Sequence, residues 1–295
     1  MKRIVNYEIT PSENGMTIAY FLRQQGYTRK SISTLKKQEG AFSINGNCVS
    51  AGTCLKEGTT LIVTIFETAT SENIEAENLP LKILYEDEDI LVVDKPAGMA
   101  IHPSINHHYG TLANSVMGYY NRQGIKYVFR CLNRLDRDTS GVVILAKHML
   151  AGAIMSKAVK NGLFHKEYMA VVSGCVKGMG IINAPIGRVE GSIIERQIDL
   201  IKGKDAITHY ETIKSGDKYS LLKIVLETGR THQIRVHMKH IGHPLPGDFL
   251  YNPDFRDISR QALHCYKIGF EHPITKEQME FVSELPEDMK RLMAD

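Results

Sequence analysis

The densest group of chemically versatile side chains lies in the loop Asn133-Arg-Leu-Asp-Arg-Asp-Thr-Ser-Gly141, directly before an apolar run. Two arginines and two aspartates this close together can order themselves as ion pairs, or they can hold a carboxylate ready for chemistry. The hydroxyls of Thr139 and Ser140 and the flexible Gly141 permit close approach to the backbone. Taken alone, the loop leaves both interpretations open: a salt-bridged structural loop or a reactive site.

A second polar cluster, Glu227-Thr-Gly-Arg-Thr-His-Gln-Ile-Arg-Val-His237, leads into a helix that we predict over residues 231–241, capped by Thr231. Because a helix N-terminus attracts anions, this cluster suits phosphate. Arg235, one turn into the helix, can pair with a carboxylate from elsewhere. A third piece, Lys166-Glu-Tyr168, places an aromatic ring with a polar tip at a strand start, where tyrosine is more often a core residue than a functional one.

Four histidines, His232, His237, His240 and His243, raise the question of a metal site. No cysteine lies close enough in sequence to complete a zinc site, so we expect local hydrogen bonds or phosphate contacts and no metal. The chain has no GxGxxG after a strand, no GxxxxGK[ST], no GxSxG and no HExxH. These absences remove the sequence support for dinucleotide, nucleoside-triphosphate, serine-hydrolase and zincin chemistry.

Several predicted elements must position these side chains. Apolar runs predict buried strands over 89–94 and 141–147, with further strands over 168–172 and 219–226. A helical stripe covers 148–161. Strands and helices mix without strict alternation, which favours an α+β fold over a doubly wound sheet.

The first 66 residues predict a small separate unit. It comprises a helix over 17–25, a second helix over 29–38 capped by Thr28, a hairpin at Asn45-Gly46-Asn47 and a strand over 60–65. The second helix carries the basic residues Arg29, Lys30, Lys36 and Lys37. This pattern indicates an RNA-binding unit, with an ordinary small domain bearing a polar helix face as the alternative.

Charge and composition fit this division. The chain has 295 residues, 43% of them hydrophobic, and a net charge of +3. Residues 1–66 carry eight lysines and arginines against four glutamates, whereas 67–80 hold four glutamates and no base. The acidic segment has little apolar content, so we interpret it as a linker between domains 1–66 and 81–295. The basic surplus raises the question of nucleic acid, with a solvated surface as the alternative.

Other sequence features indicate where the protein works. No apolar run approaches the roughly 18 residues of a membrane span. The N-terminus lacks the pattern of a secretory signal, and the five cysteines form no CxxC pair. We therefore expect a cytoplasmic protein that does not bind a membrane.

A series of motifs runs in order through 81–295: Val93-Asp-Lys-Pro-Ala-Gly98, His102-Pro103, Arg134-Leu-Asp136, Thr139-Ser-Gly141, Lys166-x-Tyr168, Thr228-Gly-Arg-Thr-His-Gln-Ile-Arg235, Gly242-His-Pro244, Gly247-Asp248, Tyr251, Ala262-Leu-His264 and His272-Pro273. Together they resemble the RluA-type pseudouridine synthases. The motifs Thr28-Arg-Lys-Ser-Ile and Phe42-Ser-Ile-Asn-Gly-Asn resemble the S4-like RNA-binding module found in one branch that modifies large-subunit ribosomal RNA. The resemblance implies a mixed, mostly antiparallel sheet flanked by helices, preceded by a small S4-like α/β module.

The implied reaction isomerises a uridine within RNA, without cofactor or metal, after the base has been flipped out of its stack. The resemblance makes Asp136 the essential carboxylate, either attacking C1′ or removing a proton from C2′. Arg235 would keep it ionised, and Tyr168 would stack on the uracil and assist loss of the C5 proton. Arg134 would fill the gap left by the base. Arg230 and His232 would contact RNA, as would the basic helix of the S4-like module.

One position departs from the family pattern: Asn133 stands where histidine is usual. Asparagine does not titrate near neutrality, so this position would orient the loop rather than carry a proton. Two alternatives remain open: a non-catalytic RNA-binding or ribosome-assembly factor on a synthase-like core, and a hydrolase using the histidines. The resemblance to that branch implies large-subunit (23S) ribosomal RNA as the partner, and we expect a monomer.

Overall fold

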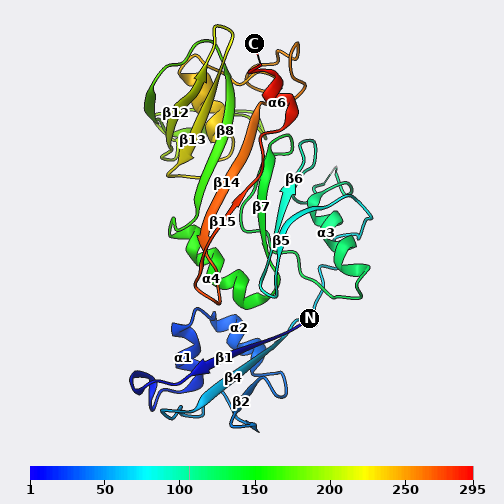
Figure 1. Cartoon of the computed structure of the whole chain (residues 1–295), viewed down its shortest axis with the longest axis vertical. Helices are drawn as coiled ribbons and strands as arrows, with labels where there is room; N and C mark the ends of the chain where they lie inside the picture. Colours follow the sequence, from blue (N-terminus) through cyan, green and yellow to red (C-terminus); the bar gives the residue numbers. More distant parts are fainter. Residues whose placement is uncertain (106, 295) are drawn as a thin grey trace.

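The computed structural model describes residues 1–105 and 107–294, which form a four-stranded, a two-stranded and a nine-stranded sheet with helices packed around them (Figure 1). A small four-stranded sheet lies at one end and a nine-stranded sheet makes up the larger body. The first unit contains β1 (Lys2–Glu8), a short 3-10 helix (Pro11–Glu13), α1 (Ile18–Gln24), α2 (Arg29–Leu35), β2 (Phe42–Ile44), β3 (Asn47–Cys48) and β4 (Thr60–Phe66).

Local sequence signals explain this first unit. The side chain of Thr17 accepts the Tyr20 N–H at the start of α1, and Thr28 accepts the Ser31 N–H at the start of α2. Asn45 and Gly46 both have positive φ, which makes the tight turn between β2 and β3. These predicted helices, the hairpin and the final strand are confirmed. The sequence did not predict β1, in which exposed residues alternate with less exposed ones and which pairs antiparallel with β4.

The larger body is built on the strand order β5-β6-β7-β14-β8-β13-β12-β9, with β15 paired to β14. Among the described residues, its strand pairs are antiparallel except β7 with β14. The predicted α+β fold, with a mixed and mostly antiparallel sheet, is therefore confirmed. Its elements are β5 (Lys82–Glu86), β6 (Ile90–Lys95), α3 (Leu112–Asn121), β7 (Ser140–Ala146), α4 (Met149–Lys160), β8 (His165–Ser173), β9 (Met179–Asn183), β10 (Ile186–Arg188), β11 (Arg196–Ile198), β12 (Ile207–Ser215), β13 (Tyr219–Leu226), α5 (Gln233–His240), β14 (Leu263–Glu271), β15 (Gln278–Val282) and α6 (Glu287–Arg291).

The parallel pairing of β7 with β14 sets the position of the loop before β7. Gly141 has φ +116°, and a Cβ there would lie 2.2 Å from the carbonyl oxygen of Cys265 on β14. Only glycine allows this approach of the two backbones. All seven residues of β7 are buried, so the polar loop 133–139 is attached directly to the centre of the core.

The acidic segment 67–80 is ordered against the larger body. Glu67 is buried: its Oε2 accepts a hydrogen bond from Arg130 Nη2 at 2.8 Å and its Oε1 accepts the Met149 N–H at 2.7 Å. The carbonyl of Glu77 approaches Gly118 of α3 so closely that a Cβ there would lie 1.9 Å from it. Polar groups and backbone, rather than apolar side chains, hold this segment against the larger body.

The first unit also packs directly on α4. Leu150 is fully buried within the apolar core of the N-terminal unit, and Ile154 lies against Gly26. Arg3 of β1 forms a bidentate ion pair with Asp89 of the larger body, at 2.8 and 2.9 Å. Because α4 follows β7, this contact lies at the end of β7 opposite loop 133–139 (Figure 1). No helix in the described residues is both long and apolar enough to cross a membrane.

Candidate active site

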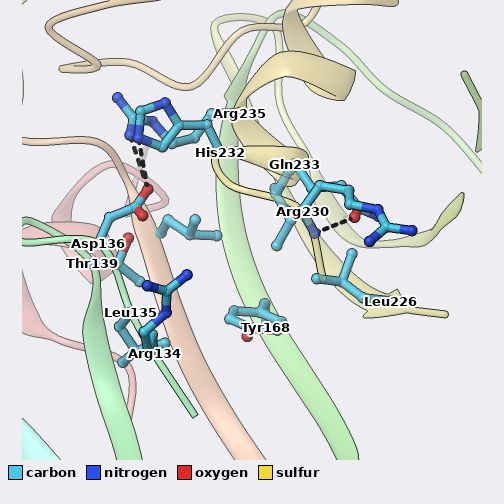
Figure 2. A pocket seen from close by; sticks show the side chains of 12 residues that line it. Arg134, Leu135, Asp136, Thr139, Tyr168, Leu226, Arg230, His232, Gln233 and Arg235 are labelled. Atoms are coloured by element: carbon cyan, nitrogen blue, oxygen red, sulfur yellow. Dashed lines mark hydrogen bonds and ion pairs between the residues drawn. The ribbon is translucent and has the colours of Figure 1, made fainter. Parts of the chain in front are cut away.

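Loop 133–139 and helix α5 bring Asp136 and Arg235 together across 99 positions of the chain. Arg235 Nη1 donates a hydrogen bond to Asp136 Oδ2 at 2.9 Å, as Figure 2 shows. The side chain of Arg235 is 1% exposed, whereas that of Asp136 is 30% exposed. The carboxylate therefore faces solvent and incoming ligand while its arginine partner is fixed in the protein.

A second carboxylate holds Arg235 from behind. Asp248 accepts hydrogen bonds from Nε and Nη2 of Arg235, each at 2.7 Å, and is itself completely buried. Burial alone would lower the pKa of Arg235, but the hydrogen bonds and charges of Asp248 and Asp136 raise it above its usual value. The sequence motifs included Asp248 but gave it no role. Asp248 follows a glycine and is flanked by apolar residues in the sequence. That pattern could have indicated a buried aspartate, which requires a positively charged partner.

Helix α5 starts differently from the prediction. Its N-cap is His232, in the left-handed conformation with φ 58°, and no side chain among the described residues caps the helix there. The predicted cap by Thr231 is wrong because Gln233 holds the turn instead. Gln233 Oε1 accepts the Arg230 N–H at 3.0 Å, and Gln233 Nε2 donates to the carbonyl of Ile207 at 2.9 Å. The turn is thus anchored on β12.

The unusual backbone of His232 turns its ring toward Asp136. His232 Nε2 lies 3.8 Å from Asp136 Oδ2, and Nδ1 lies 2.9 Å from the hydroxyl of Tyr251. That hydroxyl accepts the Arg196 N–H at 2.9 Å, so its own proton is available to Nδ1. Burial lowers the pKa of His232. The structure therefore places this histidine beside the carboxylate, although the sequence assigned it only to RNA contact.

Tyr168 lines the same pocket as Asp136 and Arg235, from strand β8 (Figure 2). Burial, followed by the nearby Cys265 and Asp136, raises the pKa of Tyr168 well above its usual value. Its predicted roles, stacking on the uracil and assisting loss of the C5 proton, stay predictions. The complete lining is Arg134, Leu135, Asp136, Thr139, Tyr168, Leu226, Arg230, His232, Gln233, Ile234, Arg235 and Leu263.

Arg134 and Arg230 are exposed at the rim of this pocket. Arg230 Nε donates to the carbonyl of Asp205 at 2.9 Å, which fixes the side chain beside the start of β12. Asn133 is buried: its amide donates to the Val142 carbonyl at 3.0 Å and accepts the Ile144 N–H at 2.9 Å. Asn133 therefore anchors the loop to β7, the orienting role expected for it.

The remaining predicted residues lie elsewhere. Arg29, Lys30, Lys36 and Lys37 are exposed on or just after α2, in the N-terminal unit and away from the pocket (Figure 1). His237 bonds to Thr208 and to the Ala184 carbonyl, each at 2.9 Å. Across residues 1–105 and 107–294, the histidines of this region belong to no group with metal-binding geometry.

Comparisons with known proteins agree on one family. Residues 89–240 match the sequence profile of the family described as RNA pseudouridylate synthase. The chain is 43% identical over 279 residues to the uncharacterized RNA pseudouridine synthase YjbO of Bacillus subtilis, covering 94% of this chain and 98% of that protein. It is 35% identical over 285 residues to the ribosomal large subunit pseudouridine synthase D of Vibrio cholerae, covering 89% and 86%.

A solved structure shows the same arrangement. The human RNA pseudouridylate synthase domain containing 1 superposes with a TM-score of 0.59 at 27% identity, over 71% of this chain and 85% of that one.

Proposed function

The chain belongs to the RNA pseudouridylate synthase family, and from that premise we propose that it isomerises uridines of ribosomal RNA, with Asp136 as the essential carboxylate. The observation that carries the proposal is the Asp136–Arg235 pair in the pocket, at 2.9 Å, with Asp248 behind it. A relative is named for the large ribosomal subunit, and that supports 23S ribosomal RNA as the substrate.

The reaction breaks the C1′–N1 bond of uridine, turns the base and joins C5 to C1′, while C5 loses its proton and N1 takes one up. The atoms of substrate and product are the same, so no co-reactant is needed. The target uracil must leave its stack to reach Asp136, because a base stacked between its neighbours cannot enter a protein pocket. In this proposal Arg134, which is exposed on the same loop as Asp136, occupies the vacated position, where its planar guanidinium can stack on neighbouring bases.

The residues of the pocket have complementary roles. Arg235, itself immobilised, fixes the orientation of the Asp136 carboxylate and supplies a positive charge beside it. Both routes considered for Asp136, attack at C1′ and proton removal from C2′, require that negative charge. Tyr168 contributes an aromatic face for the uracil, while Arg230 and His232 suit the flanking RNA backbone.

The N-terminal unit is proposed as an S4-like RNA-binding domain, residues 1–66, joined by segment 67–80 to the synthase domain, residues 81–295. The exposed basic residues of α2 and its end, Arg29, Lys30, Lys36 and Lys37, support this role because phosphate contacts provide most of the non-specific affinity for RNA. We place the protein in the cytoplasm as a monomer.

The test uses 23S ribosomal RNA transcribed with tritium at uracil C5. The wild-type protein should release tritium, and Asp136→Asn should release none while binding RNA nearly as well. Asp217→Asn, an exposed carboxylate in a turn, is the matched control and should react at the wild-type rate. If Asp136→Asn still released tritium, Asp136 would not be the essential carboxylate. Tight RNA binding without release from RNA or assembled subunits would instead favour a non-catalytic assembly factor.

A further inference from the structure

Five consecutive residues that begin with Asp136 are each held by a side chain from another part of the chain. These contacts join the Asp136 carboxylate to Arg235, the Arg137 carbonyl to Lys95, the Asp138 carbonyl to Arg260, the Thr139 hydroxyl to Gln261, and the Ser140 hydroxyl to His264. The first of them belongs to the pocket. The other four contacts come from side chains that do not line the pocket, and they have no part in the proposed chemistry.

Three of the four supports come from one short segment, residues 260–264, which leads into β14. His264 is buried, and its Nε2 lies 2.9 Å from the carbonyl of Ser283. A carbonyl only accepts, so Nε2 carries the proton and Nδ1 accepts from the Ser140 hydroxyl at 2.8 Å. The parallel pairing of His264 with Ser140 places this segment alongside the loop.

Within this segment, Arg260 contacts both the loop and helix α6. Its Nη1 donates to the Asp138 carbonyl at 3.2 Å, while Nε and Nη2 bind the two oxygens of Asp288 at 2.6 and 2.8 Å. Asp288 lies on α6, whose Met289 is fully buried against Ala262 and Ile258. Helix α6 therefore both packs on the 258–262 segment and clamps the guanidinium that holds the loop.

We propose that Arg260, oriented by Asp288 of α6, is a positioning residue for pseudouridine formation, setting the loop that presents Asp136. The inference rests on the proposed role of Asp136. A bidentate arginine is suited to this role because its planar fork fixes direction as well as distance. A loop displaced by even about 1 Å loses the alignment that a reacting carboxylate needs, at a cost of up to about 100-fold in rate.

The test measures single-turnover tritium release from C5-labelled ribosomal RNA, together with the dissociation constant for that RNA. Arg260→Lys keeps the charge but loses the fork, and Asp288→Asn keeps the shape but weakens the clamp. Both should slow release about 10- to 100-fold, with RNA affinity within about twofold of wild type. Lys290→Gln is the matched control on the same helix, since the Lys290 side chain pairs with Glu287 at the surface, and it should react normally.

Hydrogen exchange separates positioning from general instability. In both variants, amides in peptides covering 133–141 should exchange faster, while those of α3 keep their protection. Wild-type rates and unchanged loop exchange in Arg260→Lys and Asp288→Asn would overturn this inference and leave the proposed function intact. Turnover by Asp136→Asn would overturn the proposed role of Asp136 and this inference with it.

Discussion

Asp248 binds Arg235 through two parallel hydrogen bonds of 2.7 Å, leaving the Nη1 side of the guanidinium directed at Asp136. The arginine is thus shared between a buried acid, which fixes it, and a partly exposed acid, which it presents to the pocket. This division explains how one cation can be immobile and still act on a group that must meet substrate.

Replacing Asp248 should damage both stability and activity. Asp248→Asn removes one charge of a buried pair and leaves Arg235 poorly compensated, which costs about 3–5 kcal/mol in the free energy of unfolding. The freed guanidinium no longer holds Asp136, so tritium release from C5-labelled RNA should also fall. Urea unfolding followed by circular dichroism measures the first effect.

The control for that change is Asp254→Asn, in the same region but in an exposed ion pair with Arg256. It should leave the denaturation midpoint and the reaction rate unchanged. Equal effects of the two substitutions on stability and rate would contradict the role of Asp248 in holding Arg235.

The contact between the N-terminal unit and the larger body should weaken in acid. Burial would raise the pKa of Asp89, but hydrogen bonds from His148 and Arg3 outweigh it and lower the pKa to about 2. Because the folded-state value lies below the ordinary 3.8, the stabilisation is present above about pH 4 and is lost as pH falls toward 2. His272 and Asp87 also face this carboxylate.

Thermal unfolding between pH 5 and pH 2 measures this loss. The midpoint of the wild-type protein should fall more steeply than that of Asp89→Asn, and the two curves should converge near pH 2. Asp217→Asn should follow the wild type throughout. Parallel curves for wild type and Asp89→Asn would show that Asp89 does not provide the acid-sensitive stabilisation.

The basic residues of the N-terminal unit should affect RNA affinity and not the chemical step. Exchanging Arg29, Lys30, Lys36 and Lys37 for glutamine should lower affinity and flatten the dependence of log K on log salt, by about 0.7–0.9 for each phosphate that these side chains neutralise. The rate at saturating protein should stay unchanged, because these side chains lie far from Asp136. Lys56→Gln, in a loop of the same unit, is the control.

Point substitutions are preferable to deletion of residues 1–66. Leu150 is buried in the core of that unit, so deletion would expose an apolar surface on α4 and remove the partner of Asp89. If the four-site variant bound RNA with unchanged affinity and salt dependence, the RNA-binding role of α2 would be wrong.

The sequence predicted the parts of the site that lie within continuous polar motifs. Asp136 and Arg235 stand in two such motifs, and the structure brings them into contact. Local rules also predicted α1, α2 and the hairpin, because capping and turn residues act over a few positions.

The sequence could not assign roles that depend on distant contacts. Arg260 donates to the backbone carbonyl of Asp138, 122 positions earlier in the chain. Every residue type has such a carbonyl, so the residue type at position 138 gives no sign of this contact. Similarly, Thr231 has the right type for a helix cap, but Gln233 displaces it through bonds to β12 that local propensity does not encode. Segment 67–80 has too few apolar residues for its packing to be predicted from the sequence. Its Glu67 is nevertheless buried, where it pairs with Arg130.

The attachment of loop 136–140 to residues 260–288 has a consequence for synthesis of the protein. A nascent chain that ends after β13 already contains Asp136, Tyr168 and the whole of strand β7. It still lacks the partners of Asp138, Thr139 and Ser140, which lie more than 120 positions later. The contacts that hold the reactive loop are therefore complete only when the last elements fold, and we expect an unfinished chain on the ribosome to be inactive toward the RNA around it.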